Sequence, residues 1–185
     1  MGNFYGNMTL RTEDKAAVVD TLSSLRRDAY VVAALGYTVV YDKEELNASR
    51  VKKLLLDLTK HFACVGFGVA VADDDVLEYY LAEGGRLVDE YDSNPGYDTG
   101  RAQPPRGGDP ARLCAALGRV GQEETVRAIL HDLSPVFELD RHRALIEALD
   151  LPTAALGMGF TYLAKGEAQD VGLTDVTPVG NAPEP

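Results

Sequence analysis

The chain has 185 residues, 45% of them hydrophobic and 25% charged, which suits a globular domain whose core needs no disulfide or metal to hold it. The formal net charge of −11 argues against a nucleic-acid-binding surface, which needs clustered Lys and Arg, and it favours attraction to a basic partner. Only two cysteines occur, and neither a secretory signal nor an apolar run of membrane-spanning length is found, so we expect a cytoplasmic protein.

The first 62 residues alternate between strand-like and helix-like patterns. A mixed run at 3–11 predicts a half-buried strand, and the helical spacing that follows predicts a helix capped by Thr12. Two β-prone runs at 30–35 and 37–41 predict a pair of short strands around a turn. A second helix, at about 46–62, carries one apolar stripe formed by Val51, Leu54, Leu55, Leu58 and Phe62.

The run 65–91 predicts the centre of the fold, a meander of three antiparallel strands. Large apolar residues alternate with small ones in its first strand, the acidic triplet 73–75 forms the first turn, and Gly-Gly at 84–85 is a strong hairpin signal. Gly66 and Gly68 leave one face of the first strand nearly bare. We therefore expect a helix or a bound group to pack closely against that face.

The remaining half of the chain is less regular. Residues 92–108 show no periodicity, which predicts a long loop that is either functional or mobile. Asp109-Pro110 marks a helix start, and three short helices are expected between 110 and 150. The run 154–163 predicts a final strand, and the polar residues 166–185 predict a disordered tail.

These elements predict an α+β fold with a mostly antiparallel sheet. The meander at about 65–91 lies at its centre, with two packing helices before it and a short helical segment at about 110–150 after it. We expect a single domain over 1–165, followed by the tail. The lack of regular β-α-β alternation weighs against a doubly wound nucleotide-binding fold.

A rim of acidic residues follows from the strand directions of the meander. Its third strand ends at the same edge of the sheet as the first turn, which brings the acidic triplet and the loop after Tyr91 to one rim. Hard cations such as Ca²⁺ or Mg²⁺ prefer oxygen ligands on flexible backbone. The candidate ligands for such a cation are Asp73, Asp74, Asp75, Asp92 and Asp98. The alternative is a charged turn beside a polar loop, both simply solvated.

The same rim is the candidate binding surface. Tyrosines combine contact area, rigidity and a hydroxyl, and their acidic neighbours suit a basic protein or a cationic group held against an aromatic face. Two arginines in the loop could instead hold an anion near the helix start at 109–110. The candidate binding residues are Tyr80, Tyr91, Asp92, Ser93, Asn94, Tyr97, Arg101 and Arg106. The alternative is that these tyrosines only cover the sheet.

The function indicated by these features is protein binding rather than catalysis. No nucleophile-elbow, zinc-protease or Cys-x-x-Cys motif occurs, and no side chain is identified as a general base. The segment DEYDSNPGYD resembles segments of small bacterial proteins, a resemblance that implies no activity. We expect a small acidic protein, of inhibitor or immunity type, that recognises a basic partner through the 73–75 turn and the 92–108 loop without a cofactor. The alternative is a metal-assisted hydrolase that uses the acidic rim.

Overall fold

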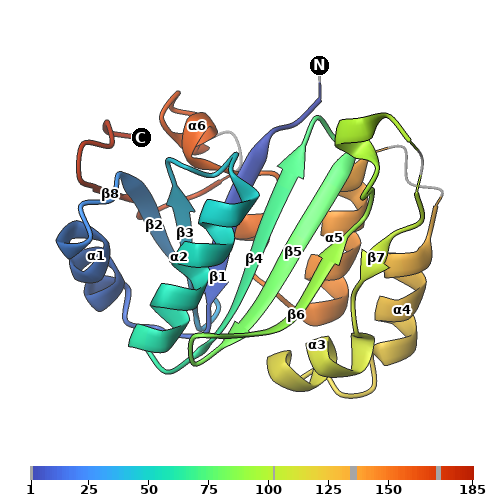
Figure 1. Ribbon diagram of the computed structural model, residues 1–185. Helices are drawn as coiled ribbons and strands as arrows, with labels where there is room; N and C mark the ends of the chain where they lie inside the picture. The colour runs from blue at the N-terminus through green and yellow to red at the C-terminus, as the bar shows by residue number, and fades with distance from the viewer. Residues whose placement is uncertain (1, 102, 134–136, 170–171) are drawn as a thin grey trace.

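The computed structural model describes residues 2–101, 103–133, 137–169 and 172–185, without the side chain of Asp98. Within these ranges the chain forms one eight-stranded antiparallel sheet and six α-helices, which confirms the predicted α+β class (Figure 1). In chain order the elements are β1 (Tyr5–Leu10), α1 (Lys15–Ser24), β2 (Ala29–Ala34), β3 (Tyr37–Asp42), α2 (Ala48–His61), β4 (Val65–Ala72), β5 (Val76–Glu83), β6 (Arg86–Asp92), the 3-10 turn η1 (Tyr97–Thr99), β7 (Arg106–Gly107), α3 (Pro110–Leu117), α4 (Glu123–His131), α5 (Glu138–Leu149), the 3-10 turn η2 (Thr153–Ala155), α6 (Phe160–Leu163) and β8 (Thr177–Val179).

The sheet is built from a split β-α-β unit that is extended at both edges. Its strand order is β7-β6-β5-β4-β1-β3-β2-β8, in which β1 lies between β3 and β4. Strands β4, β5 and β6 are the predicted meander, so this part of the prediction is confirmed. The turn at Gly84 and Gly85 has positive φ angles of 55° and 82°, which glycine adopts without steric cost.

Helices α1 and α2 cover one face of the sheet, with α2 lying across β1, β4 and β5 (Figure 1). The two bare positions of β4 accommodate α2, which confirms that something packs closely there. A Cβ atom added to Gly66 would lie 2.6 Å from Thr59 Cγ2 and 2.7 Å from Leu55 Cδ1. At Gly68 the nearest atom to an added Cβ would be Leu55 Cδ2, at 3.2 Å. The glycines therefore set how near the helix can approach the strand.

A methyl group at position 66 is expected to destabilise the fold by forcing α2 away from β4. Overpacking of a close-packed core costs about 1–3 kcal/mol, so Gly66→Ala should lower the free energy of unfolding by that amount. Gly68→Ala is the control, because its nearest neighbour is farther away and the expected loss is smaller. Urea unfolding followed by circular dichroism measures both, and equal losses would contradict the packing explanation.

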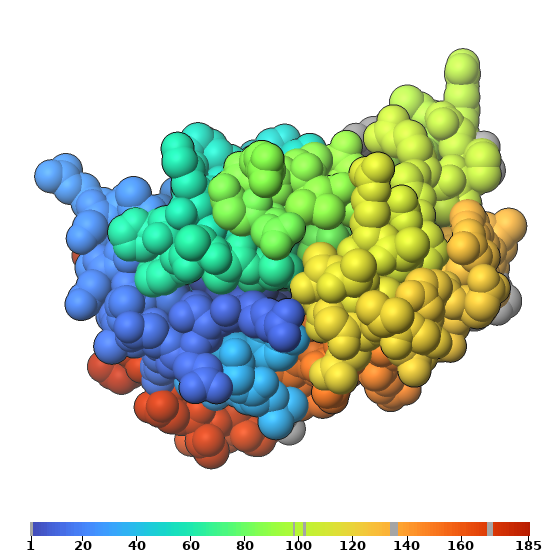
Figure 2. Space-filling model, turned by 90° about the horizontal axis from the view of Figure 1, so that it is seen from below, coloured from blue at the N-terminus to red at the C-terminus, as the bar shows by residue number. Residues whose placement is uncertain are grey.

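The C-terminal helices cover the opposite face of the sheet. Seen from below, α2 and the meander occupy one side of the molecule, and the orange and red C-terminal segments occupy the other (Figure 2). The core on this side contains tyrosines from five strands together with apolar residues of α3 to α6. Tyr79 and Tyr91 stack with ring centroids 5.4 Å apart, and the Tyr91 hydroxyl donates to the carbonyl of Leu130 at 2.7 Å.

Two buried polar side chains attach residues 154–161 to the sheet. The Asn7 side-chain amide donates to the carbonyls of Ala155 and Met158, at 2.7 and 2.8 Å. The Glu45 carboxylate accepts hydrogen bonds from the backbone N–H groups of Phe160 and Thr161 at the start of α6. Burial raises the pKa of Glu45, and these donors act in the opposite direction.

Several sequence predictions outside the meander differ from the structure. Residues 154–163 were predicted as a strand, but they form η2 and α6, because Asn7 and Glu45 satisfy the polar groups of a helical segment. The predicted disordered tail contains β8, which pairs with the edge of β2. Thr12 does not cap α1, because the Asp14 side chain accepts from the backbone of Ala17 instead. No helix of the described residues has the length and apolarity to cross a membrane.

Candidate functional site

The site begins with four neighbouring side chains on the helix-covered face of β5 and β6. In the strand register, Glu78 lies directly opposite Asp92, and Tyr80 lies directly opposite Glu90. Positions two apart in a strand share a face, so the four side chains form one square. Carboxylates placed directly opposite one another repel, and this square contains such a pair. The square lies at the margin of the area that α2 covers.

Two cations partly compensate the acidic square. Lys52 of α2 places its Nζ atom 2.6 Å from Glu90 Oε2 and 5.3 Å from the centroid of the Tyr80 ring. Arg106 of β7 lies 3.7 Å from Asp92, a long contact, and its side chain is 78% exposed. Glu90 thus pairs with Lys52 and Asp92 with Arg106, and Glu78 accepts from the Tyr80 hydroxyl. Together with Ser49 and backbone of β6 and β7, these side chains line a hollow of about 310 Å³.

A second hollow of about 260 Å³ continues the first toward the edge of the sheet, and both are lined by Glu78 and Asp92. Leu46, which precedes α2, and Tyr97 of η1 lie on its walls and are 62% and 37% exposed. We call the two hollows together the acidic groove. Its lining residues are Leu46, Ser49, Lys52, Ala72, Val76, Glu78, Tyr80, Glu90, Tyr91, Asp92, Asn94, Pro95, Tyr97, Arg106 and Gly107.

The Tyr80 side chain is more buried than the sequence indicates. Tyr79 and Tyr80 are adjacent in β5 and face opposite sides of the sheet, and they are only 0% and 6% exposed. Burial, followed by the charge of Glu78, raises the pKa of Tyr80. The hydroxyl therefore stays protonated at neutral pH and donates to Glu78 Oε1 at 3.1 Å. Tyr80 thus forms the floor of the groove, with its ring presented to a cation.

The predicted binding residues divide into two groups. Tyr80, Asp92, Asn94, Tyr97 and Arg106 line the acidic groove, and Asn94 also donates to the carbonyl of Asp75 at 3.3 Å. That last contact places the loop after β6 beside the acidic turn, where the strand directions predicted it.

The other three predicted binding residues serve different purposes. The Tyr91 side chain packs in the core of the opposite face, although Tyr91 is also among the residues that line the first hollow. Ser93 is buried, where its hydroxyl accepts from Leu77 N–H at 2.8 Å. Arg101 is exposed on the loop between η1 and β7 and lies outside the lining of both hollows.

The carboxylates of the first turn hold the start of the chain. Asp73 Oδ1 accepts from Gly2 N–H at 3.1 Å, and Asp74 Oδ2 accepts from the backbone and side-chain amides of Asn3 at 3.0 and 2.9 Å. Asp75 is exposed. Asp92 faces Arg106 and the backbone of Asn94 instead.

These contacts bear on the predicted divalent-cation site. Across the described residues, no group of three or more His, Cys, Asp or Glu side chains is placed to hold a metal ion. The predicted ligand Asp98 has its side chain outside the described part of the chain. Asp73, Asp74 and Asp92 therefore contact different neighbours: Gly2, Asn3, and Asn94 with Arg106.

Several residues of the groove are absent from the sequence-based candidate residues, among them Leu46, Lys52, Glu78 and Glu90. Glu78 and Glu90 could have been found as acidic neighbours of Tyr79 and Tyr80 on the paired strands, although the residues that lie directly opposite depend on a register shift between Leu81 and Ala82. Lys52 could not, because its contact with Glu90 joins residues 38 apart in the sequence. It depends on how α2 crosses the sheet.

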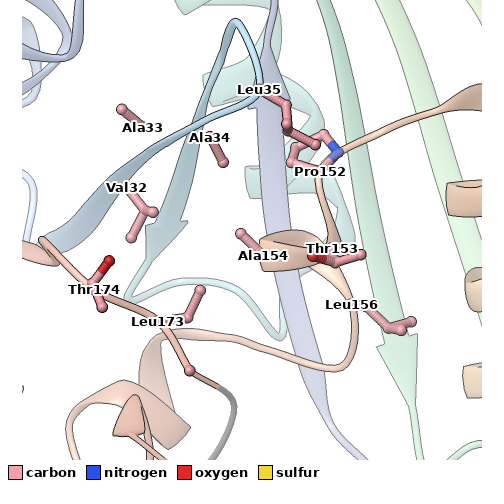
Figure 3. Close-up of a pocket in the computed structure, with 11 residues that line it drawn as sticks. Val32, Ala33, Ala34, Leu35, Pro152, Thr153, Ala154, Leu156, Leu173 and Thr174 are labelled. Carbon is pink, nitrogen blue, oxygen red and sulfur yellow. The ribbon is translucent and has the colours of Figure 1, made fainter.

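A separate hollow of about 400 Å³ lies near the end of β2. Figure 3 shows side chains from β2 and its turn on one side and residues of the η2 segment on another, with the chain at 173–174 completing the wall. Its described lining is apolar apart from two threonine hydroxyls and exposed backbone, and it carries no charged side chain. None of the predicted site residues lies there.

Comparisons with models of known protein families, with curated proteins and with solved structures find no match to this chain.

Proposed function

We propose that this protein binds a basic segment of another protein in the acidic groove. The position of Lys52 carries the proposal. Its ammonium group lies over the Tyr80 ring and beside Glu90, as the Lys or Arg of a partner would. Glu78 and Asp92 are the opposed pair next to it, and the exposed Arg106 lies 3.7 Å from Asp92. A further cation from a partner would relieve their repulsion.

The surroundings of the groove support a protein as the ligand. Protein interfaces combine apolar anchors with a charged or polar rim, and Leu46 and Tyr97 supply exposed apolar surface beside the carboxylates. The net charge of −11 would accelerate the approach of a basic partner at low ionic strength. An inhibitory role of immunity type, in which the groove covers a basic surface of a target, is the form of this function that the charge favours.

The proposal is tested with a fluorescein-labelled octa-arginine peptide and fluorescence anisotropy. Glu78→Gln with Asp92→Asn removes the opposed carboxylates, and we expect the affinity to fall about tenfold, which corresponds to about 1.4 kcal/mol. The matched control is Glu83→Gln with Glu147→Gln, two exposed carboxylates outside the groove whose loss changes the net charge equally. It should weaken binding about twofold or less.

The comparison between the two double variants decides the outcome. Equal weakening in both would mean that the peptide responds only to net charge, which contradicts a defined site. Raising the salt concentration should weaken the binding of the wild type, because exposed charges are screened. An affinity that changes neither with salt nor in the variant with Glu78→Gln and Asp92→Asn would also count against the groove.

A further inference from the structure

A second charged hollow lies on the same helical face as the acidic groove, and three of its lining side chains are cations. It occupies about 390 Å³ between the end of α1 and the first half of α2. Leu25 and Leu54 give it an apolar floor, and Leu25 is 49% exposed. Its charged lining consists of Arg27, Arg50, Lys53 and Asp57. The three cations pair with the carboxylates of Asp42, Glu44 and Asp57, of which only Asp57 lines the hollow.

Arg27 is a fixed cation in this hollow. Its Nε atom donates to Asp42 Oδ2 at 2.8 Å, and its Nη2 atom donates to the other oxygen of the same carboxylate. Asp42 is 3% exposed, so this bidentate pair is held rigidly from beneath. The hydrogen bond with Asp42 raises the pKa of Arg27. A guanidinium has five N–H donors, and the pair uses only two of its nitrogens, so Arg27 can bind a second anion without moving.

Arg50 and Lys53 are cations that can change partners. They lie three residues apart on α2, which places them side by side on the helix surface. Arg50 pairs with Glu44 at 2.9 Å and Lys53 with Asp57 at 2.7 Å, and all four side chains are at least 44% exposed. Exposed pairs of this kind contribute about 0–1 kcal/mol, so an incoming anion displaces them at low cost. Arg50 also lies in the first turn of α2, where the helix dipole favours negative charge.

We propose that the hollow between α1 and α2 binds a small organic phosphate. A phosphate monoester carries a charge of about −1.5 to −2 at pH 7 and three acceptor oxygens, which suits three cations better than the single charge of a carboxylate. The apolar part of the ligand covers Leu25 and Leu54. This site is distinct from the acidic groove, although Ser49 at the start of α2 lines both.

The probe is phenyl phosphate, titrated into the ¹⁵N-labelled protein and followed by amide chemical shifts. The amides of Leu25, Arg27 and Leu54 should move together, whereas those of β5 and β6 should not. Arg50→Met with Lys53→Met should weaken binding at least tenfold. Lys43→Met with Lys60→Met is the matched control, because it removes the same charge from exposed positions outside the hollow. It should change the affinity by less than about twofold.

Three results would overturn the proposal. The first is equal weakening by the two double variants, which would indicate unspecific attraction to positive charge. The second is inorganic phosphate binding as tightly as phenyl phosphate, because the apolar floor would then contribute nothing. The third is benzoate binding as tightly as phenyl phosphate, which would assign the hollow to carboxylates. Weaker binding of both comparison probes, with the variant effect above, is the supporting outcome.

Discussion

Replacing Arg141 by Met is expected to lower the free energy of unfolding by about 3–5 kcal/mol at pH 7. Arg141 is 4% exposed, and its Nε atom donates to Glu138 Oε2 at 2.8 Å. Its Nη atoms donate to the carbonyls of Ile129 and Asp132, which joins α5 to the end of α4. The variant would leave a buried carboxylate and two carbonyls without this donor, and such uncompensated groups account for the large cost.

The same helix supplies the control for this prediction. Arg143 pairs with Asp140 at the same spacing of three residues, but both side chains are about half exposed. Arg143→Met should therefore change the free energy of unfolding by less than about 0.5 kcal/mol. Urea unfolding of the two variants makes the comparison. Similar losses in both would show that the Arg141 pair contributes nothing through its burial.

The Arg141→Met deficit should shrink at acidic pH. Burial raises the pKa of Glu138, and the hydrogen bond and charge of Arg141 act in the opposite direction. Without Arg141 the pKa of Glu138 rises further, so lowering the pH protonates the carboxyl in the folded variant and removes the uncompensated charge. Adding Glu138→Gln to Arg141→Met should likewise restore part of the stability at pH 7. A deficit that is independent of pH and of Glu138 would contradict this explanation.

Acid is expected to destabilise the fold through His142 by about 4–5 kcal/mol between pH 6.5 and pH 3. His142 is fully buried, and desolvation lowers its pKa from 6.5 to about 3. The folded protein therefore keeps a neutral imidazole while the unfolded chain takes up a proton below pH 6.5. Unfolding binds that proton throughout this window, so the contribution to stability is present above pH 6.5 and is lost as the pH falls.

Difference measurements isolate His142 from the other buried groups. Burial raises the pKa values of Glu45 and Glu138, so those carboxyls favour the folded state at low pH and oppose the histidine. His142→Leu removes the histidine titration alone, and its stability relative to the wild type should improve steadily from pH 6.5 to pH 3.

Tyr5→Phe is the control for the histidine prediction. The Tyr5 hydroxyl lies 2.8 Å from Nδ1 of His142, and burial raises the pKa of that hydroxyl, so it stays protonated. Tyr5→Phe loses the hydrogen bond but keeps the buried imidazole, and it should retain the acid sensitivity of the wild type. The prediction fails if His142→Leu and the wild type lose stability in parallel as the pH falls.

The acidic groove illustrates how far the sequence leads toward a site. Strand direction alone placed the loop after Tyr91 next to the acidic turn, and the contact between Asn94 and the carbonyl of Asp75 agrees with that placement. Which of the predicted binding residues line the groove and which only support the fold was less predictable. Ser93 and Tyr91 carry the residue types of a binding surface, but they serve the backbone of β5 and the opposite core. The face that a strand side chain reaches follows from the two-residue alternation and the register of its strand. A loop residue has no such period from which its direction could be predicted.

The sequence by itself determined the elements whose signals are local: the meander, its Gly-Gly turn, the amphipathic α2 and the start of α3 at Asp109-Pro110. Periodicity and turn chemistry act over a few residues, so they can be interpreted without knowing the partner surface. Only the tertiary structure decided that 154–163 is helical, that the tail adds β8, and that Lys52 lies over Tyr80. Each of these depends on groups that are distant in the sequence, such as Glu45 with the N–H groups of Phe160 and Thr161. The free energy of such contacts exceeds weak local preferences, and it does not exist until the chain has folded.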